Sequence, residues 1–229
     1  MSASKPQDIR NVVFLGHGGS GKTTLGEAML FAAKVTTRLG SVADGTGLLD
    51  HTDIEKDRKH SVEPSMAFIE HDGKTINIID APGYPDFIGG ALYAMAGADI
   101  AVVVVSATGG IEVNTRRLFR EAQSLGKAIA IVVNKIDAEN VDLEALVGHM
   151  QDGLSSGCKP FNLPTNGGKG VVDCFLNTEG TADFGDVADA HIQLTESVIE
   201  VDEALMEAYL GGEPVAQDKL IGAFDKAMI

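Results

Sequence analysis

The sequence predicts an α/β fold with a mostly parallel sheet, one antiparallel strand and helices on both faces. Apolar runs of strand length alternate with stretches whose apolar residues follow helical spacing. Two of these runs, Ile100–Val105 and Ala128–Val133, are apolar throughout, as in parallel strands that helices cover on both faces. Two further strands, Met66–Ile69 and Thr75–Ile79, are separated by Asp72-Gly73, a strong signal for an antiparallel hairpin.

The other elements follow from the same patterns. A first strand at Asn11–Leu15 leads into a helix at Lys22–Ala33. The composition shifts after Gly157, so we expect one domain over residues 1–157 and a small α+β insert over residues 158–229. The remaining predicted helices are Pro85–Ala96, Ile111–Leu125, Val141–Leu154, Val187–Tyr209 and Ala216–Met228, and a short strand is predicted at Val171–Phe175.

The chain has 229 residues, with 18 Lys and Arg against 33 Asp and Glu, which gives a net charge of −15. A surface this acidic repels phosphate backbones, so we expect no direct nucleic-acid binding by this chain alone. The N-terminus has no export signal, the longest apolar run is too short to cross a bilayer, and Cys158 and Cys174 lack metal-ligand spacing. These features predict a cytoplasmic protein with reduced thiols and no membrane partner.

A glycine-rich segment follows the first strand and opens the first helix. Residues 16–23 (GHGGSGKT) match G-x-x-x-x-G-K-[ST], the phosphate-binding pattern of P-loop nucleoside triphosphatases, in the strand–loop–helix context that this pattern requires. The glycines let backbone N–H groups converge on phosphate oxygens, and the helix N-terminus adds positive potential. We expect Lys22 to reach the β- and γ-phosphates and the Thr23 hydroxyl to bind Mg²⁺.

Two later motifs complete the predicted nucleotide site. Asp80 ends a strand and opens D-A-P-G, where a carboxylate can hold Mg²⁺ through water and the Gly83 N–H can meet a γ-phosphate. Residues 134–137 (NKID) follow an apolar strand. Guanine presents N1–H and a 2-amino group side by side, and the Asp137 carboxylate can accept both, which would select GTP over ATP. The Lys135 stem can lie along the base, and Asn134 can tie this loop to the P-loop.

With these motifs in order, the sequence resembles translational GTPases of the elongation factor G group. Residues 77–87 (NIIDAPGYPDF) are similar to the family's N-I-I-D-T-P-G-H-x-D-F, and residues 58–62 (RKHSV) occupy the place of its switch I segment R-G-I-T-I. Residues 202–211 (DEALMEAYLG) are similar to D-D-E-L-L-E-K-Y-L-E-G of its G′ insert. The resemblance covers residues 11–229. It implies a Ras-like G domain with a G′ insert, a GTP-hydrolysing switch and the ribosome as partner.

Four departures from the family pattern bear on function. Tyr84 stands where the family has a catalytic histidine that orients the attacking water, and Gly19 replaces the aspartate of the P-loop A-H-I-D-A-G-K-T. Ser61 replaces the switch I threonine that binds Mg²⁺. With these three changes, the sequence resembles the elongation-factor-G-like paralogue group rather than the main translocase. The fourth departure is the absence of the fifth motif, a Ser-Ala pair after a sixth strand.

That absence leads us to expect the N-terminal part of a longer protein, whose further domains contact the ribosome. Without a sixth strand, Ala128–Val133 should form a sheet edge that either recruits a partner or is covered by the C-terminal helices.

The sequence therefore predicts a switch that binds GTP or GDP with Mg²⁺ and hydrolyses GTP slowly without a partner, since tyrosine is a poor base at neutral pH. Switch I is expected near residues 44–62 and switch II near residues 80–87. Two alternatives stay open: a GTP sensor with little hydrolysis, motivated by Tyr84, and a P-loop ATPase or kinase, which Asp137 disfavours. The predicted catalytic residues are Lys22, Gly83 and Tyr84, and the predicted Mg²⁺ ligands are Thr23, Ser61 and Asp80. The predicted nucleotide-binding residues are His17 (in a structural role), Gly18, Gly19, Ser20, Gly21, Lys22, Thr23, Thr24, Asn134, Lys135 and Asp137.

Overall fold

The computed structural model describes residues 5–211, 215 and 217–227. The chain separates into two compact units, Met1–Asn134 and Lys135–Ile229. The predicted domain boundary after residue 157 stays a prediction, because a compact unit and a domain need not share their limits. The strands of the first unit are β1 (Ile9–Leu15), β2 (Ser65–His71), β3 (Lys74–Asp80), β4 (Ile100–Ser106) and β5 (Ala128–Asn134). Its helices are η1 (Pro6–Asp8), α1 (Lys22–Ala32), α2 (Asp53–Arg58), η2 (Pro85–Phe87), α3 (Ile88–Ala96) and α4 (Val113–Ser124).

The first unit is built on one five-stranded sheet with the order β2-β3-β1-β4-β5. All neighbouring strands are parallel except β2 and β3, which form the predicted antiparallel hairpin. Asp72 and Gly73 both have positive φ, 46° and 73°, as the two central residues of a tight hairpin turn require. The predicted α/β class, with one antiparallel strand, is confirmed.

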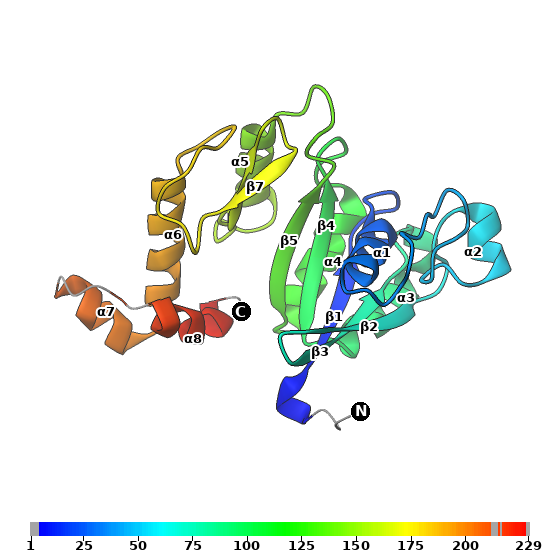
Figure 1. Cartoon of the computed structure of the whole chain (residues 1–229), viewed down its shortest axis with the longest axis horizontal. Helices are drawn as coiled ribbons and strands as arrows, with labels where there is room; N and C mark the ends of the chain where they lie inside the picture. Colours follow the sequence, from blue (N-terminus) through cyan, green and yellow to red (C-terminus); the bar gives the residue numbers. More distant parts are fainter. Residues whose placement is uncertain (1–4, 212–214, 216, 228–229) are drawn as a thin grey trace. The chain divides into compact units, whose positions relative to one another are not determined.

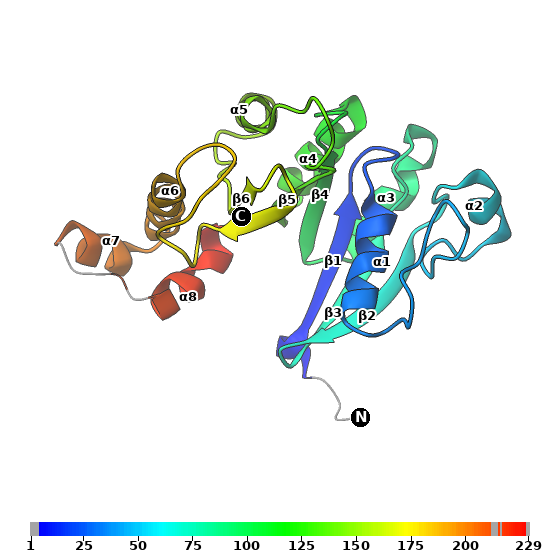
Figure 2. The ribbon, with the colours of Figure 1, turned by 45° about the horizontal axis from the view of Figure 1, so that its top comes forward.

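Helices cover both faces of this sheet, with α1 on one face and α4 on the other (Figure 1, Figure 2). Side chains of β1 alternate between the faces. Phe14 packs with Leu30 of α1 and Ile78 of β3. Its neighbours Val13 and Leu15 are also fully buried and point to the opposite side. This two-sided burial explains why β1 reads as a continuous apolar run.

The strand register brings three motifs to the same edge of the sheet. Phe14 of β1 is level with Asp80 at the end of β3, and Ser106 of β4 is level with Asn134 at the end of β5. Parallel strands share their carboxyl ends, where open α/β sheets bind ligands. The P-loop, the D-A-P-G turn and Asn134 therefore leave the sheet together.

The second unit combines a small hairpin with helices. Its elements are α5 (Leu143–Gly153), β6 (Asn162–Thr165), β7 (Gly170–Asp173), α6 (Val187–Ile199), α7 (Glu203–Leu210) and α8 (Gln217–Ala227). Strands β6 and β7 are antiparallel. Three phenylalanine rings, Phe161, Phe175 and Phe224, meet with centroids 5.2 to 5.6 Å apart and help close its core.

Three sequence predictions need correction. The helix predicted over Val187–Tyr209 is two helices, because the Asp202 side chain accepts a hydrogen bond from the Leu205 N–H and caps a new start. Strand β6 was missed because Pro164 lies in it, and proline usually argues against a strand. The structure tolerates it because β6 is a short strand with a single neighbour in the described sheet, β7. Helix α2 was missed as well. Residues 216 and 228, the ends of the last predicted helix, lie outside the described residues.

In the described part of the chain, no helix has the length and apolarity needed to cross a membrane.

Strand β5 differs from its prediction as a buried strand, since all seven residues are only half-buried. The reason is its place at the end of the described sheet, with β4 as its neighbour.

An apolar edge of this kind favours pairing with another chain. We expect this chain to self-associate at high concentration, and Ala130→Lys to weaken the association by placing a charge on the edge. Light scattering measures both. A monodisperse monomer of the unmodified chain with β5 bare would contradict the expectation, whereas a monomer whose C-terminal helices cover β5 would match the alternative stated for this edge.

Candidate nucleotide-binding site

The P-loop connects β1 to α1 and is held in place by Asn134. The Asn134 Nδ2 group donates to the Ser20 carbonyl at 3.0 Å. Gly21 has φ of 95°, and a Cβ there would collide with the Asn134 amide. Position 21 therefore needs glycine for both its backbone and its space. The structure thus joins the first and third motifs directly.

The N-terminus of α1 has no side-chain cap within the described chain, a feature that it shares with α3 and α4 and that distinguishes it from α5 and α6. Helices α5 and α6 begin with Asp142 and Asp186, whose carboxylates accept backbone N–H groups of the first turn. Gly21 precedes α1, and no described side chain caps that helix. The first-turn N–H groups of α1 can therefore bind an anion, which the helix dipole also favours.

Lys22 is buried beside this helix start. Its Nζ donates to the carbonyl of His17 at 2.8 Å and to that of Gly16 at 3.2 Å. Burial lowers the Lys22 pKa, and the negative charges of Asp80 and Asp50 oppose this shift. The ammonium is thus placed inside the loop that is expected to surround phosphate oxygens.

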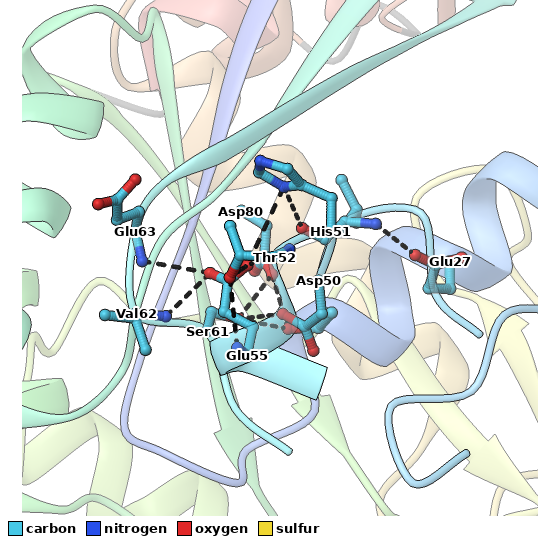
Figure 3. Close-up of polar contacts among 11 residues, drawn as sticks. Glu27, Asp50, His51, Thr52, Glu55, Ser61, Val62, Glu63 and Asp80 are labelled. Carbon is cyan, nitrogen blue, oxygen red and sulfur yellow. Dashed lines mark hydrogen bonds and ion pairs between the residues drawn. The ribbon is translucent and has the colours of Figure 1, made fainter. Parts of the chain in front are cut away.

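Two hydroxyls and two carboxylates converge next to Lys22, and Figure 3 shows Ser61, Asp50 and Asp80 among them. The Thr23 hydroxyl donates to Asp80 Oδ2 at 2.6 Å, and the Ser61 hydroxyl donates to Asp50 Oδ1 at 2.8 Å. The Thr23 and Ser61 oxygens lie 3.1 Å apart. Because each hydroxyl proton points to a carboxylate, lone pairs of both oxygens remain for another group. The predicted residues Thr23, Ser61 and Asp80 come together, with Asp50 as a fourth member that the sequence did not reveal.

Asp80 is fully buried, and burial raises its pKa to about 6, against the Thr23 hydrogen bond and the Lys22 charge. Its Oδ1 atom and Asp50 Oδ2 are buried without a hydrogen-bond partner in the described structure. Buried carboxylate oxygens without partners are costly, and a cation would compensate them. The site therefore has the oxygen donors that a hard divalent cation prefers.

Two buried glutamates hold the segment that carries Asp50 and Ser61 (Figure 3). Glu27 of α1 accepts the Leu49 N–H at 2.8 Å. Glu55 of α2 accepts the backbone N–H of Thr52 at 3.2 Å and the Thr52 hydroxyl at 2.8 Å. It also accepts the N–H groups of Val62 and Glu63 at 3.0 and 3.3 Å. The T-x-x-E capping box of α2 is visible in the sequence and could have revealed this helix.

The D-A-P-G turn lies against the P-loop. A Cβ at Gly83 would collide with Lys22 Nζ and with the His17 backbone, so this glycine allows the two loops to touch. Asn114 of α4 donates its Nδ2 proton to the Gly83 carbonyl at 2.8 Å. Asn114 was not predicted, since a helical asparagine carries no motif.

His17 is held at the opposite end of the loop. Its Nε2 is 2.9 Å from Glu112 Oε1, and its Nδ1 is 3.4 Å from the Thr115 hydroxyl. These contacts suit the structural role predicted for His17. The other P-loop positions differ in exposure: Ser20 is buried, Gly18 is half-buried, and Gly19 and Thr24 are exposed.

The loop predicted to bind the base begins the second unit and is described within that unit. Lys135 and Asp137 are exposed, and Lys135 has φ of 60°. The β6–β7 turn packs on this loop, where a Cβ at Gly168 would collide with the Ile136 carbonyl. The structure joins Asn134 to the P-loop within the first unit, whereas Lys135 and Asp137 are placed only relative to the second.

Comparison with known proteins identifies the family. The profile of the elongation factor Tu GTP binding domain matches residues 7–214. An elongation factor G-like protein of Mycobacterium tuberculosis is 35% identical over 240 residues, 99% of this chain and 34% of that protein. The tetracycline resistance protein TetW of Butyrivibrio fibrisolvens is 31% identical over 212 residues, 93% of this chain and 31% of that protein. A crystal structure of a Thermus thermophilus protein matches with a TM-score of 0.86 and 36% identity, over 96% of this chain and 36% of its own.

The chain spans about a third of the length of these relatives. The matched region starts before β1 and includes all three motifs, so the likeness extends over the whole described site. The chain belongs to the elongation factor Tu GTP binding domain family, and within this family it resembles the elongation-factor-G-like proteins.

Proposed function

We propose that this chain binds and hydrolyses GTP as the nucleotide-dependent switch of an elongation-factor-G-like translation factor that acts on the ribosome in the cytoplasm. The observation that carries this proposal is the convergence of Thr23, Ser61 and Asp80 beside Lys22 and the open N-terminus of α1. We also propose that the G domain extends to residue 157 and the G′ insert from residue 158. The ribosome follows from the family resemblance.

The phosphates are bound by the P-loop N–H groups and the Lys22 ammonium. The base is bound by the Asp137 carboxylate, with the Lys135 stem along its face and Asn134 holding the two loops together. These roles give the chain its preference for guanine over adenine nucleotides.

The Thr23 and Ser61 hydroxyls would hold Mg²⁺, with Asp80 acting through water. The carboxylates that receive both hydroxyl protons leave lone pairs for the ion, and the buried Asp80 Oδ1 lacks a partner among the described residues. The bound ion would offset the charge on the β- and γ-phosphates.

The catalytic residues predicted from the sequence each have a role in this hydrolysis. Lys22 stabilises negative charge that develops on the phosphates. Gly83 lies against Lys22, and its carbonyl accepts a hydrogen bond from Asn114 at 2.8 Å, so its N–H would be available to the γ-phosphate. Tyr84 follows directly and orients the attacking water through its hydroxyl.

The direct test is phosphate release from γ-labelled GTP under single turnover, with and without ribosomes. GTP hydrolysis that ATP does not inhibit supports the proposal. A chain that binds GTP but releases no phosphate under either condition would favour a nucleotide sensor. Tyr84 in place of histidine is the observation behind that alternative.

Replacing Tyr84 with phenylalanine should lower the single-turnover rate at least tenfold, equivalent to about 1.4 kcal/mol, with little change in GTP affinity. The hydroxyl is lost while the ring remains. Tyr84→His should keep or raise the rate. The control is Tyr93→Phe, because Tyr93 lies on α3 and is 83% exposed. An unchanged rate in Tyr84→Phe would assign Tyr84 to packing alone.

A further inference from the structure

The rings of His60 and Tyr84 meet next to the P-loop. Their centroids are 4.6 Å apart and their planes are tilted by 49°. Phe87 lies beside His60, with centroids 6.4 Å apart. His60 comes from the switch I segment and Tyr84 from switch II, so this contact joins the two switches.

Three substitutions relative to the family strings fit one another at this contact. The strings given above have isoleucine at the position of Gly18, isoleucine at the position of His60 and histidine at the position of Tyr84. A Cβ at Gly18 would lie 2.7 Å from a carbon of the Tyr84 ring, so glycine at position 18 leaves the space that this ring occupies, and a larger residue there would displace it. The imidazole that is absent from position 84 is present at position 60, in contact with the residue that replaced it.

A backbone contact fixes the tautomer of His60. Its Nδ1 lies 2.9 Å from the Arg58 carbonyl oxygen. A carbonyl oxygen can only accept, so Nδ1 carries the proton and Nε2 of the neutral ring is an acceptor. An acceptor nitrogen is what a residue needs to bind a proton of a water molecule.

Both rings are attached next to fixed points of the site. His60 precedes Ser61, which is hydrogen-bonded to Asp50 at 2.8 Å and close to Thr23 at 3.1 Å. Tyr84 follows Gly83, which touches Lys22 Nζ and is held by Asn114. The imidazole and the phenol are therefore each attached one residue away from a group of the proposed phosphate and Mg²⁺ site.

We propose that His60 is a catalytic residue of GTP hydrolysis, whose Nε2 accepts a hydrogen bond from one O–H of the attacking water while the Tyr84 oxygen accepts a hydrogen bond from the other. A lone pair of the water then faces phosphorus. The water oxygen forms a bond to the γ-phosphorus, and the bond from that phosphorus to the bridging oxygen breaks with its electron pair remaining on GDP. Both water protons leave with the phosphate as H₂PO₄⁻. This inference rests on the proposed GTP hydrolysis.

The test is a cycle of variants measured as single-turnover phosphate release, with GTP affinity measured separately. His60→Ile should lower the rate at least tenfold and change GTP affinity less than twofold. The double variant His60→Ile with Tyr84→His returns the imidazole to the family position and should recover the rate to within about threefold of the unmodified chain. His60→Gln, which keeps an acceptor oxygen, should retain more activity than His60→Ile.

The matched control is His71→Ile. His71 lies on β2, outside both switch segments, and its side chain is 72% exposed, so its loss should leave the rate unchanged. An unchanged rate in His60→Ile would overturn the proposal. Equal losses in His60→Ile and the double variant would also overturn it, because His60 would then only pack. If the unmodified chain binds GTP without hydrolysing it, the proposed hydrolysis fails and this role for His60 fails with it.

Discussion

Asp137→Asn should weaken GTP binding by roughly 30- to 1,000-fold, which corresponds to about 2–4 kcal/mol. In the proposed role, the carboxylate of Asp137 accepts two hydrogen bonds from guanine, and the asparagine amide would place an N–H group against at least one of these donors. Asp137→Ala should have an effect of similar size. Fluorescent guanine nucleotides and competition with unlabelled GTP and ATP measure the affinities.

A change of nucleotide makes this test specific. Xanthine has a carbonyl where guanine has its 2-amino group, so the side-chain amide of the Asp137→Asn variant could donate a hydrogen bond to this carbonyl. Xanthosine triphosphate should therefore bind the variant better than GTP does. Glu139→Gln is the control, because Glu139 is an exposed carboxylate in the same loop. Equal affinity of the unmodified chain for ATP and GTP would refute the predicted role of Asp137.

Asp80→Asn should stabilise the nucleotide-free chain at neutral pH while it weakens Mg²⁺-dependent GTP binding. Burial raises the Asp80 pKa from 3.8 to about 6, so its charged form is disfavoured in the folded state. A shift of this size corresponds to roughly 3 kcal/mol of lost stability once the carboxyl is charged.

The upward shift of the Asp80 pKa makes the stability of the folded chain depend on pH. Between pH 3.8 and about 6 the folded chain binds more protons at Asp80 than the unfolded chain does, so the contribution of Asp80 to stability falls as pH rises. The stabilising effect of Asp80→Asn should therefore be largest above pH 6 and vanish near pH 4.

Denaturant unfolding in EDTA at several pH values measures this difference. Asp86→Asn is the control, since Asp86 is an exposed carboxylate in the following segment. A less stable Asp80→Asn variant at pH 7 would mean that the hydrogen bonds from Thr23 and Ser61 outweigh the cost of burial.

The sequence was most informative where function depends on local geometry. The P-loop, D-A-P-G and the NKID loop each have a spacing imposed by the backbone, and the fold brings the first two and Asn134 to the same edge. The hairpin at Asp72 and Gly73 was predictable for the same reason, because it needs two residues with positive φ.

The residues that the sequence did not reveal reach the site through tertiary contacts. Asp50 accepts a hydrogen bond from Ser61, and Asn114 of α4 donates one to Gly83. Neither pair has a characteristic spacing, so only the packing of α4 and of the switch I segment brings them together. In the sequence, His60 stood out only as one residue of the switch I string. Its proposed catalytic role depends on the ring contact with Tyr84, which the sequence does not show.

The four hydrogen bonds that Glu55 receives from Thr52, Val62 and Glu63 have a consequence for motion. They join the two ends of the segment around α2, so residues 52–63 form a closed ring of contacts. Such a ring opens as one cooperative unit or not at all. The Thr52, Val62 and Glu63 amides should therefore exchange with solvent deuterium at a common rate. Loss of the γ-phosphate would then move this segment as a rigid body, with its hinges outside residues 52–63, rather than unfold it residue by residue.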